Sequence, residues 1–160
     1  MGKKRTSNGG KQPAGKTAAL DLGKARVGLA VSDELGMLAH PRPPLDGRNQ
    51  AALLTNLVDL AEDETITHFV VGLPLHLDGR EGSGADRARR FCQKLATRAN
   101  VTVELIDERL STVQAERALK EAGATRAEIK KRIDGAAAAL LLQLWLDRRT
   151  RERDSPAPPS

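Results

Sequence analysis

Residues 67–73, THFVVGL, form an apolar run that is rich in β-branched residues. Such a run is typical of a strand buried on both faces, because a strand with one face in water alternates apolar and polar residues. A sheet built around a strand of this kind needs helices on each of its faces. This one segment therefore restricts the chain to an α/β architecture.

The neighbouring segments predict the rest of the sheet. Residues 17–22 and 26–32 are short apolar runs separated by a Gly-Lys-Ala turn, which predicts a β-hairpin. Residues 37–45 contain three prolines, so a strand there can lie only at an edge of the sheet. Residues 101–106 predict a further strand after the buried one.

Helices are predicted between and after these strands. Asn49 suits the N-cap of a helix that runs to about Ala61. The other predicted helices cover residues 83–99, about 112–122, a short segment opened by a capping box at Thr125, and about 134–148. The last is apolar on nearly every face, which indicates a helix packed in the interior. The order of elements predicts a mixed five-stranded sheet with helices on both faces.

The length of 160 residues fits one domain. Residues 1–15 and 149–160 are expected to be disordered, which leaves 16–148 as the folded domain. The single cysteine cannot form an internal disulfide, and no Cys/His cluster has zinc spacing. Neither a secretory signal nor an apolar run of about 20 residues is present, so we expect a cytoplasmic protein with no membrane partner.

The positive charge is concentrated at the N-terminus. The net charge is +5, and residues 1–16 carry five basic residues and no acidic one, so the charges of the remaining chain cancel. A basic tail adds phosphate affinity without sequence preference, although it can equally be a solubilising extension. With one Trp, two Phe and no Tyr, the chain has too few aromatic residues to bind single strands by stacking.

Asp21 lies inside the first apolar run, in the sequence Ala-Leu-Asp-Leu-Gly. A carboxylate buried there needs a partner, hydrogen bonds or a metal ion. Gly23 and Gly28 leave the backbone beside it uncovered, which lets a ligand approach closely. The alternative interpretation is a carboxylate satisfied by backbone donors in a turn.

Two further carboxylates stand at the ends of apolar elements. Glu108 follows the strand at 101–106, where α/β sheets place their sites, whereas its neighbour Asp107 points to the opposite face. Glu108 can alternatively belong to a solvated charge cluster near a helix start. Asp134 opens the last predicted helix and can serve simply as its N-cap. Taken together, three carboxylates on three elements favour Mg²⁺ or Mn²⁺, and two such ions catalyse phosphodiester cleavage.

Four segments carry a family resemblance: ALDLGKARVGLAVSDELG, VVGLPLHLDGREG, ELIDERLSTVQAE and RIDGAAAALLLQLWLD. Between Thr17 and Asp147 the chain resembles the YqgF (RuvX) family, described as Holliday junction resolvases and as nucleases that process the 5′ end of pre-16S rRNA. The resemblance implies an RNase H-like fold and assigns the catalytic, metal-binding carboxylates to Asp21, Glu108 and Asp134.

Other residues near these segments are candidates for contacts with the substrate. Arg26, Arg80 and Arg109 are positioned to hold the nucleic-acid backbone, although each is by itself a common type of surface residue. His76 replaces an Asn frequent in the family, and we interpret it as a tolerated loop residue rather than a phosphate or proton contact. Gly135 stands where the family usually has Ala or Ser.

The carboxylates and the resemblance together imply a metal-dependent nuclease acting on structured RNA as a monomer or homodimer, and the resemblance implies 5′-end processing of pre-16S rRNA, which the residues themselves do not separate from junction cleavage. A Holliday junction resolvase, which would cut branched DNA, is the first alternative and needs two active sites, hence a dimer. The second is a non-catalytic module associated with RNA or transcription, against which the three carboxylates argue. An ATP-binding protein of the actin and sugar-kinase type needs two lobes, and the chain has length for one.

Overall fold

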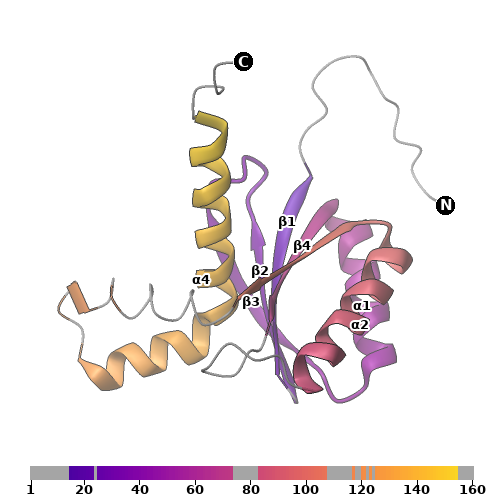
Figure 1. Cartoon of the computed structure of the whole chain (residues 1–160), viewed down its shortest axis with the longest axis horizontal. Helices are drawn as coiled ribbons and strands as arrows, with labels where there is room; N and C mark the ends of the chain where they lie inside the picture. The colour runs from indigo at the N-terminus through magenta and orange to yellow at the C-terminus, as the bar shows by residue number, and fades with distance from the viewer. Residues whose placement is uncertain are drawn as a thin grey trace.

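Two layers of helices enclose a mixed five-stranded sheet (Figure 1). The computed structural model describes residues 15–23, 25–73, 83–107, 117, 120–121, 123 and 125–154, with the backbone alone for residues 73, 83, 107, 126 and 128–136. The strands are β1 (Lys16–Leu22), β2 (Arg26–Ser32), β3 (Ala39–Asp46), β4 (Ile66–Leu73) and β5 (Thr102–Asp107). Their order in the sheet is β3-β2-β1-β4-β5. Strand β2 pairs antiparallel with β1 and with β3, whereas β4 pairs parallel with β1 and with β5. The predicted fold class is therefore confirmed.

The two extremes of the sheet follow from local sequence. The proline-rich strand β3 occupies an edge, as predicted, and Pro41 pairs with Ala30 of β2. A proline donates no hydrogen bond to a ladder, so it is tolerated where one side of the strand faces solvent. The apolar strand β4 lies inside the sheet between β1 and β5, and Phe69, Val70 and Val71 are fully buried.

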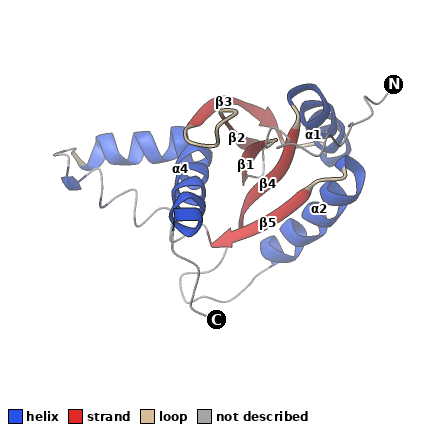
Figure 2. Ribbon diagram, turned by 90° about the horizontal axis from the view of Figure 1, so that it is seen from above, coloured by secondary structure: helices blue, strands red, loops and turns tan. Residues whose placement is uncertain are grey.

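The helices cover both faces of the sheet. Helices α1 (Gln50–Glu64) and α2 (Ser83–Ala99) lie on one face, and α4 (Arg126–Asp154) lies on the other (Figures 1 and 2). The predicted cap is confirmed, because the side chain of Asn49 accepts a hydrogen bond of 3.0 Å from the backbone N–H of Ala52. Helix α1 ends at Thr65, which adopts the left-handed conformation with φ of 56°.

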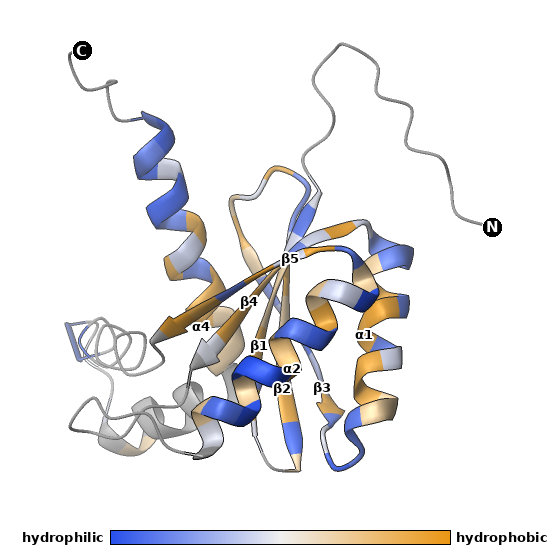
Figure 3. Ribbon diagram, turned by 45° about the vertical axis from the view of Figure 1, so that its right-hand side comes forward, coloured by the Kyte–Doolittle hydropathy of each residue, from blue (hydrophilic) through white to orange (hydrophobic). Residues whose placement is uncertain are grey.

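Side-chain alternation along the strands divides the core into two clusters. Ala18 and Leu20 of β1 pack towards α1 and α2, whereas Ala19 packs towards α4. The face beneath α4 is built from small residues, Ala19 and Ala30 among them, so the large side chains come mainly from the helix. Figure 3 shows the corresponding pattern, with hydrophobic colour along the strands and hydrophilic colour along much of α2 and at the end of α4.

Helix α4 differs from its prediction in two respects. The short helix opened at Thr125 and the helix predicted over about 134–148 form one element, which bends sharply between its first part and the remainder (Figures 1 and 2). The helix also continues to Asp154, so the prediction of disorder was wrong for residues 149–154. These residues are charged and leave no apolar pattern, but Arg and Glu are good helix formers. The predicted helix at 112–122 lies largely outside the described residues.

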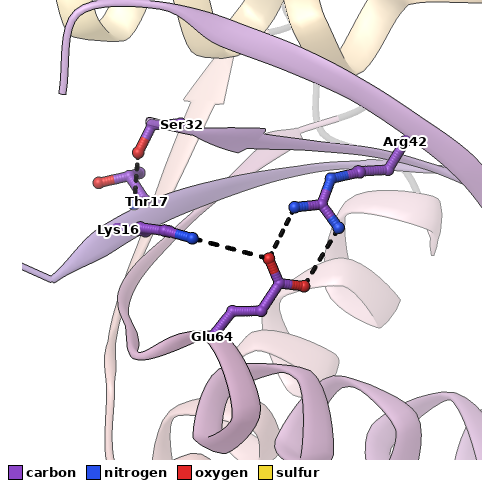
Figure 4. Close-up of polar contacts among 5 residues, drawn as sticks. All are labelled: Lys16, Thr17, Ser32, Arg42 and Glu64. Atoms are coloured by element: carbon purple, nitrogen blue, oxygen red, sulfur yellow. Dashed lines mark hydrogen bonds and ion pairs between the residues drawn. The ribbon is translucent and has the colours of Figure 1, made fainter. Parts of the chain in front are cut away.

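An ion-pair network ties β1, β3 and α1 together near the amino end of β1 (Figure 4). Two guanidinium nitrogens of Arg42 donate to the carboxylate of Glu64 at 2.6 and 3.1 Å, and Lys16 Nζ lies 3.9 Å from the same carboxylate. The buried backbone N–H of Thr17 donates to Ser32 Oγ at 2.9 Å. In the part of the chain that the structure describes, none of the helices combines the length and hydropathy that crossing a membrane requires.

The packing of α4 generates a stability prediction. Leu142 is fully buried between α4 and the sheet, so we expect Leu142→Ala to lower the free energy of unfolding by about 2–5 kcal/mol through lost contacts and the cavity left behind. Leu35→Ala is the control, because Leu35 is 78% exposed and its truncation should change stability by no more than about 0.5 kcal/mol. Urea denaturation of both variants measures the difference, and equal small losses would contradict this packing.

Candidate active site

Asp21 lies on the central strand, one residue before the end of β1. Successive side chains of a strand point to opposite faces, and Ala19 faces α4, so Asp21 also lies on the α4 face. Its side chain is partly buried, whereas Ala19 is fully buried beneath the helix. The carboxylate therefore marks the point where the core under α4 opens towards the carboxyl edge of the parallel strands.

Glycines flank Asp21 on both neighbouring strands. Gly28 of β2 pairs directly with Asp21, and a Cβ atom at Gly28 would lie 3.3 Å from Asp21 Cβ and 3.6 Å from Ala138 Cβ of α4. On the other side, Gly72 of β4 follows the pair formed by Leu20 and Val71 and shares the α4 face with Val70. Neither neighbour carries a side chain, so the strands on both sides place only backbone next to the carboxylate.

The carboxylate of Asp21 has no hydrogen-bond donor or ion-pair partner among the described residues. The described residues therefore do not provide the backbone donors that the alternative interpretation of Asp21 requires. Partly burying an unpaired carboxylate is unfavourable, because it loses hydration without receiving hydrogen bonds in return. A cation bound beside it would offset this cost.

Strand β5 ends at the same edge of the sheet. Ile106 pairs with Gly72 of β4 and packs in the cluster beneath α4, and the carboxylate of Glu104 accepts a hydrogen bond of 2.7 Å from Trp145 Nε1. Residues 104 and 106 thus face α4. Glu108 follows the last residue of β5 in the sequence and lies outside the described residues.

Asp134 lies in the interior of α4, eight residues after its start at Arg126. It is therefore not the N-cap of the last helix, and that alternative is wrong. Asp134 precedes Ala138 by about one helical turn, and Ala138 is the residue of α4 nearest to Gly28. The backbone of α4 thus brings position 134 close to the strand pair that carries Asp21, while its side chain lies outside what the structure describes.

The predicted substrate contacts are only partly covered by the structure. Arg26 is exposed at the start of β2, at the same end of the hairpin as Asp21, and pairs in register with Asp46 of β3. Arg80, Arg109 and His76 lie outside the described residues. The structure therefore brings Asp21 and Arg26 to one end of the sheet.

The described residues contain no group of three His, Cys, Asp or Glu side chains that could hold a metal ion. Two of the three predicted ligands, Glu108 and Asp134, are not counted among these side chains, because their own side chains lie outside what the structure describes. The buried thiol of Cys92 offers no alternative chemistry, because burial raises its pKa to about 11 and keeps it protonated at neutral pH. Gly72 was the feature missed from the sequence, although a glycine near the end of a buried strand indicates a close approach of a ligand or backbone.

Residues 15–148 match the family described as "RuvX: Holliday junction resolvase". A Myxococcus xanthus protein named "Putative pre-16S rRNA nuclease" is 46% identical over 82% of this chain and 87% of its own length. A protein of the same name from Anaeromyxobacter is 45% identical over 81% and 95%.

Among solved structures, Thermus thermophilus RuvC is similar with a TM-score of 0.53 and 14% identity, covering 85% of this chain and 96% of that one. The same protein in complex with a Holliday junction gives a TM-score of 0.54 at 15% identity, covering 84% and 96%. These likenesses establish the RNase H-like fold of the sheet and its helices.

The space around Asp21 can be tested by filling it. We expect Gly28→Val to lower stability by about 1–3 kcal/mol, because its side chain would enter the gap between Asp21 and Ala138, and to abolish any rise in melting temperature caused by Mn²⁺. Ala30→Val is the matched control: it overpacks the same fully buried face of β2 two residues away and leaves Asp21 uncovered. Melting curves with and without Mn²⁺ compare them, and a normal Mn²⁺ response in Gly28→Val would contradict a site here.

Proposed function

The chain belongs to the RuvX family, and from this premise we propose that it is a metal-dependent nuclease that hydrolyses phosphodiester bonds in the 5′-end processing of pre-16S rRNA. The observation that carries the proposal is the carboxylate of Asp21, which has no partner among the described residues and lies between two glycines at the carboxyl edge of the parallel strands. Relatives at 46% and 45% identity bear the name of this activity. Such processing would take place in the cytoplasm.

The proposed ligands are Asp21, Glu108 and Asp134. Strand alternation supports Glu108, because residues 104 and 106 of β5 face α4 and the next residue of that series is 108. The position of Asp134, one helical turn before Ala138, supports the third ligand. All three supply hard oxygen atoms, which fit Mg²⁺ or Mn²⁺, and we propose two ions.

The proposed residues divide into carboxylates that hold the ions and arginines that hold the substrate. When bound, the ions polarise the phosphoryl oxygen and supply a water nucleophile at neutral pH. The backbone of β1 fixes Asp21, and Gly28 and Gly72 place no side chain next to its carboxylate on the neighbouring strands, where we propose that a phosphodiester approaches. Arg26, at the same end of the hairpin, is positioned to hold a neighbouring phosphate, and we assign Arg80 and Arg109 the same task.

A junction resolvase is the second candidate function, because the chain shares its fold with RuvC. That likeness, at 14% and 15% identity, extends to the fold alone. Cutting a junction symmetrically requires two active sites in a dimer. We therefore favour RNA as the substrate, and a panel that contains both precursor rRNA and four-way junctions separates the two.

The first test is Asp21→Asn, which preserves shape and removes the charge. We expect cleavage of a pre-16S rRNA fragment in Mn²⁺ to fall at least about 100-fold, because a ligand of the catalytic ions contributes several kcal/mol to the transition state. We also expect Mn²⁺ to raise the melting temperature of the wild type and not of the variant.

Asp33→Asn provides a control for the loss of one carboxylate at a distance from the site. Asp33 accepts hydrogen bonds from the backbone N–H groups of Met37 and Leu38 in the β2–β3 turn. The Asp33→Asn variant should retain both cleavage and the rise in melting temperature with Mn²⁺. Equal shifts of the melting temperature by Mn²⁺ in the wild type and Asp21→Asn would exclude Asp21 from a metal site. Undiminished cleavage by Asp21→Asn would exclude the proposed metal-dependent mechanism at this residue.

The second test concerns Asp134. Because it lies inside α4, replacing it with Asn removes no cap, and Asn and Asp have similar helix propensities. We expect the stability of Asp134→Asn without metal to hold, or to rise as repulsion between carboxylates is relieved, while cleavage falls by about 100-fold or more.

Asp154→Asn at the end of the same helix is the matched control and should cleave normally. The measurement pairs a thermal melt without metal with a single-turnover rate in Mn²⁺. A folded Asp134→Asn protein that cleaves at the wild-type rate would remove Asp134 from the mechanism.

A further inference from the structure

A pocket of about 180 Å³ lies at the end of the sheet opposite to Asp21. The amino ends of β1 and β4, the β2–β3 turn and the last part of α4 enclose it. Its lining includes Thr17, Glu34, His68, Trp145, Arg149 and Arg153. None of these residues belongs to the proposed cleavage site.

Two arginines bring positive charge to this pocket. Arg149 and Arg153 lie one helical turn apart on α4, so they share a face of the helix. Neither forms an ion pair with a carboxylate of the described residues. The guanidinium of Arg149 lies 5.0 Å from the ring centroid of Trp145, and this stacking orients it. Glu34 is the one acidic residue of the lining.

Neutral hydrogen-bonding groups complete the lining. Thr67 Oγ1 lies 3.0 Å from His68 Nδ1, and Thr17 contributes a second hydroxyl side chain. Burial and the charge of Arg149 lower the pKa of His68, against the opposing effect of Glu104, so His68 is mostly neutral at pH 7 and can donate one hydrogen bond without adding charge. Guanidinium, imidazole and hydroxyl groups around a small cavity are the set that recognises a phosphate.

We propose that this pocket binds a phosphate group of the nucleic-acid substrate, away from the bond that is cleaved. That the nucleic acid is RNA rests on the proposed function, whereas the phosphate chemistry of the pocket does not. Thr17 and Asp21 lie four residues apart on β1, about 13 Å along the strand. At about 3.4 Å per nucleotide, this distance corresponds to about four nucleotides of a stacked strand.

The basic tail supports this placement. Residues 1–14 include Lys3, Lys4, Arg5 and Lys11 and no acidic residue, and they directly precede Gly15 in the pocket lining. In the sequence, four positive charges therefore come immediately before a residue of the pocket lining. An electrostatic contribution of this kind increases affinity for phosphates without sequence preference.

The first experiment measures phosphate binding directly. Trp145 is the only tryptophan of the chain and lines the pocket, so its fluorescence reports on the ligand. We expect a saturable change on titrating inorganic phosphate into metal-free protein, and none with chloride at equal ionic strength. Arg153→Gln should lose the response while preserving the stacking of Arg149 on Trp145. Arg148→Gln, an exposed neighbour outside the lining, is the matched control and should respond like the wild type.

The second experiment uses RNA without cleavage, in the Asp21→Asn background and without metal. We expect Arg153→Gln to weaken binding about tenfold and to reduce the slope of log K against log salt by about one, with little effect of Arg148→Gln. RNAs with a 5′-hydroxyl and a 5′-phosphate distinguish the source. Equal dependence on Arg153 identifies an internal phosphate, and dependence only in the 5′-phosphorylated RNA identifies a terminal one.

Two results would overturn the proposal. One is that phosphate leaves the fluorescence of Trp145 unchanged. If polyglutamate changes the fluorescence and phosphate does not, the pocket is instead a site for acidic protein segments. The other is equal weakening by Arg153→Gln and Arg148→Gln, which would indicate diffuse attraction. Failure of the proposed nuclease function would give a different result: the wild-type protein would not cleave RNA, but the fluorescence of Trp145 would still respond to phosphate.

Discussion

The packing of α4 against one face of the sheet determines both the core and the site. Beneath the helix, the central strands present Ala19 and Ala30, while Leu142 and its neighbours on α4 fill the space. Small side chains let the helix approach the sheet closely. Towards the carboxyl end of β1 the trend continues to Gly28, beside Asp21 and Ala138. The decrease in side-chain size along one face thus leaves Asp21 as the functional group at the end of a surface that is otherwise apolar or glycine.

That surface carries a group that does not help the fold. Asp21 is partly buried and has no partner in the part of the chain that the structure describes, an arrangement that opposes folding, and the opposite face of the sheet compensates. There, α1 and α2 bury large side chains, including Leu57, Phe69 and Leu95, against β1 and β4. Separating a tightly packed face from a face with an unsatisfied carboxylate is the arrangement expected where function is retained at some cost in stability.

Local patterns predicted the elements whose causes are local. The apolar run of β4, the prolines of β3 and the cap at Asn49 each act within a few residues, and the structure confirms all three. Non-local contacts were not predictable in this way. The bond from Trp145 to Glu104 joins residues 41 apart in the chain, and only pairing with β1 reveals what Gly72 does beside Asp21. Hydrophobic periodicity likewise could not show that α4 continues through a charged segment to Asp154.

Helix α4 connects the two ends of the molecule at which we infer contacts with nucleic acid. Asp134 and Arg153 are 19 residues apart on it, about 29 Å measured along a helical path. Between them, the helix is fixed by Leu142 in the core and by Trp145, which bonds to β5 and carries Arg149 on its ring. Gln143 also bonds to Ala39 and Met37, so the β2–β3 turn beside the pocket is held by the same helix. A nucleic-acid strand bound at both ends would therefore meet groups carried by the same helix, whose part after the bend is fixed to the sheet by these contacts. Such a connection would relate the position of the cut to that of a held phosphate without base-specific contacts.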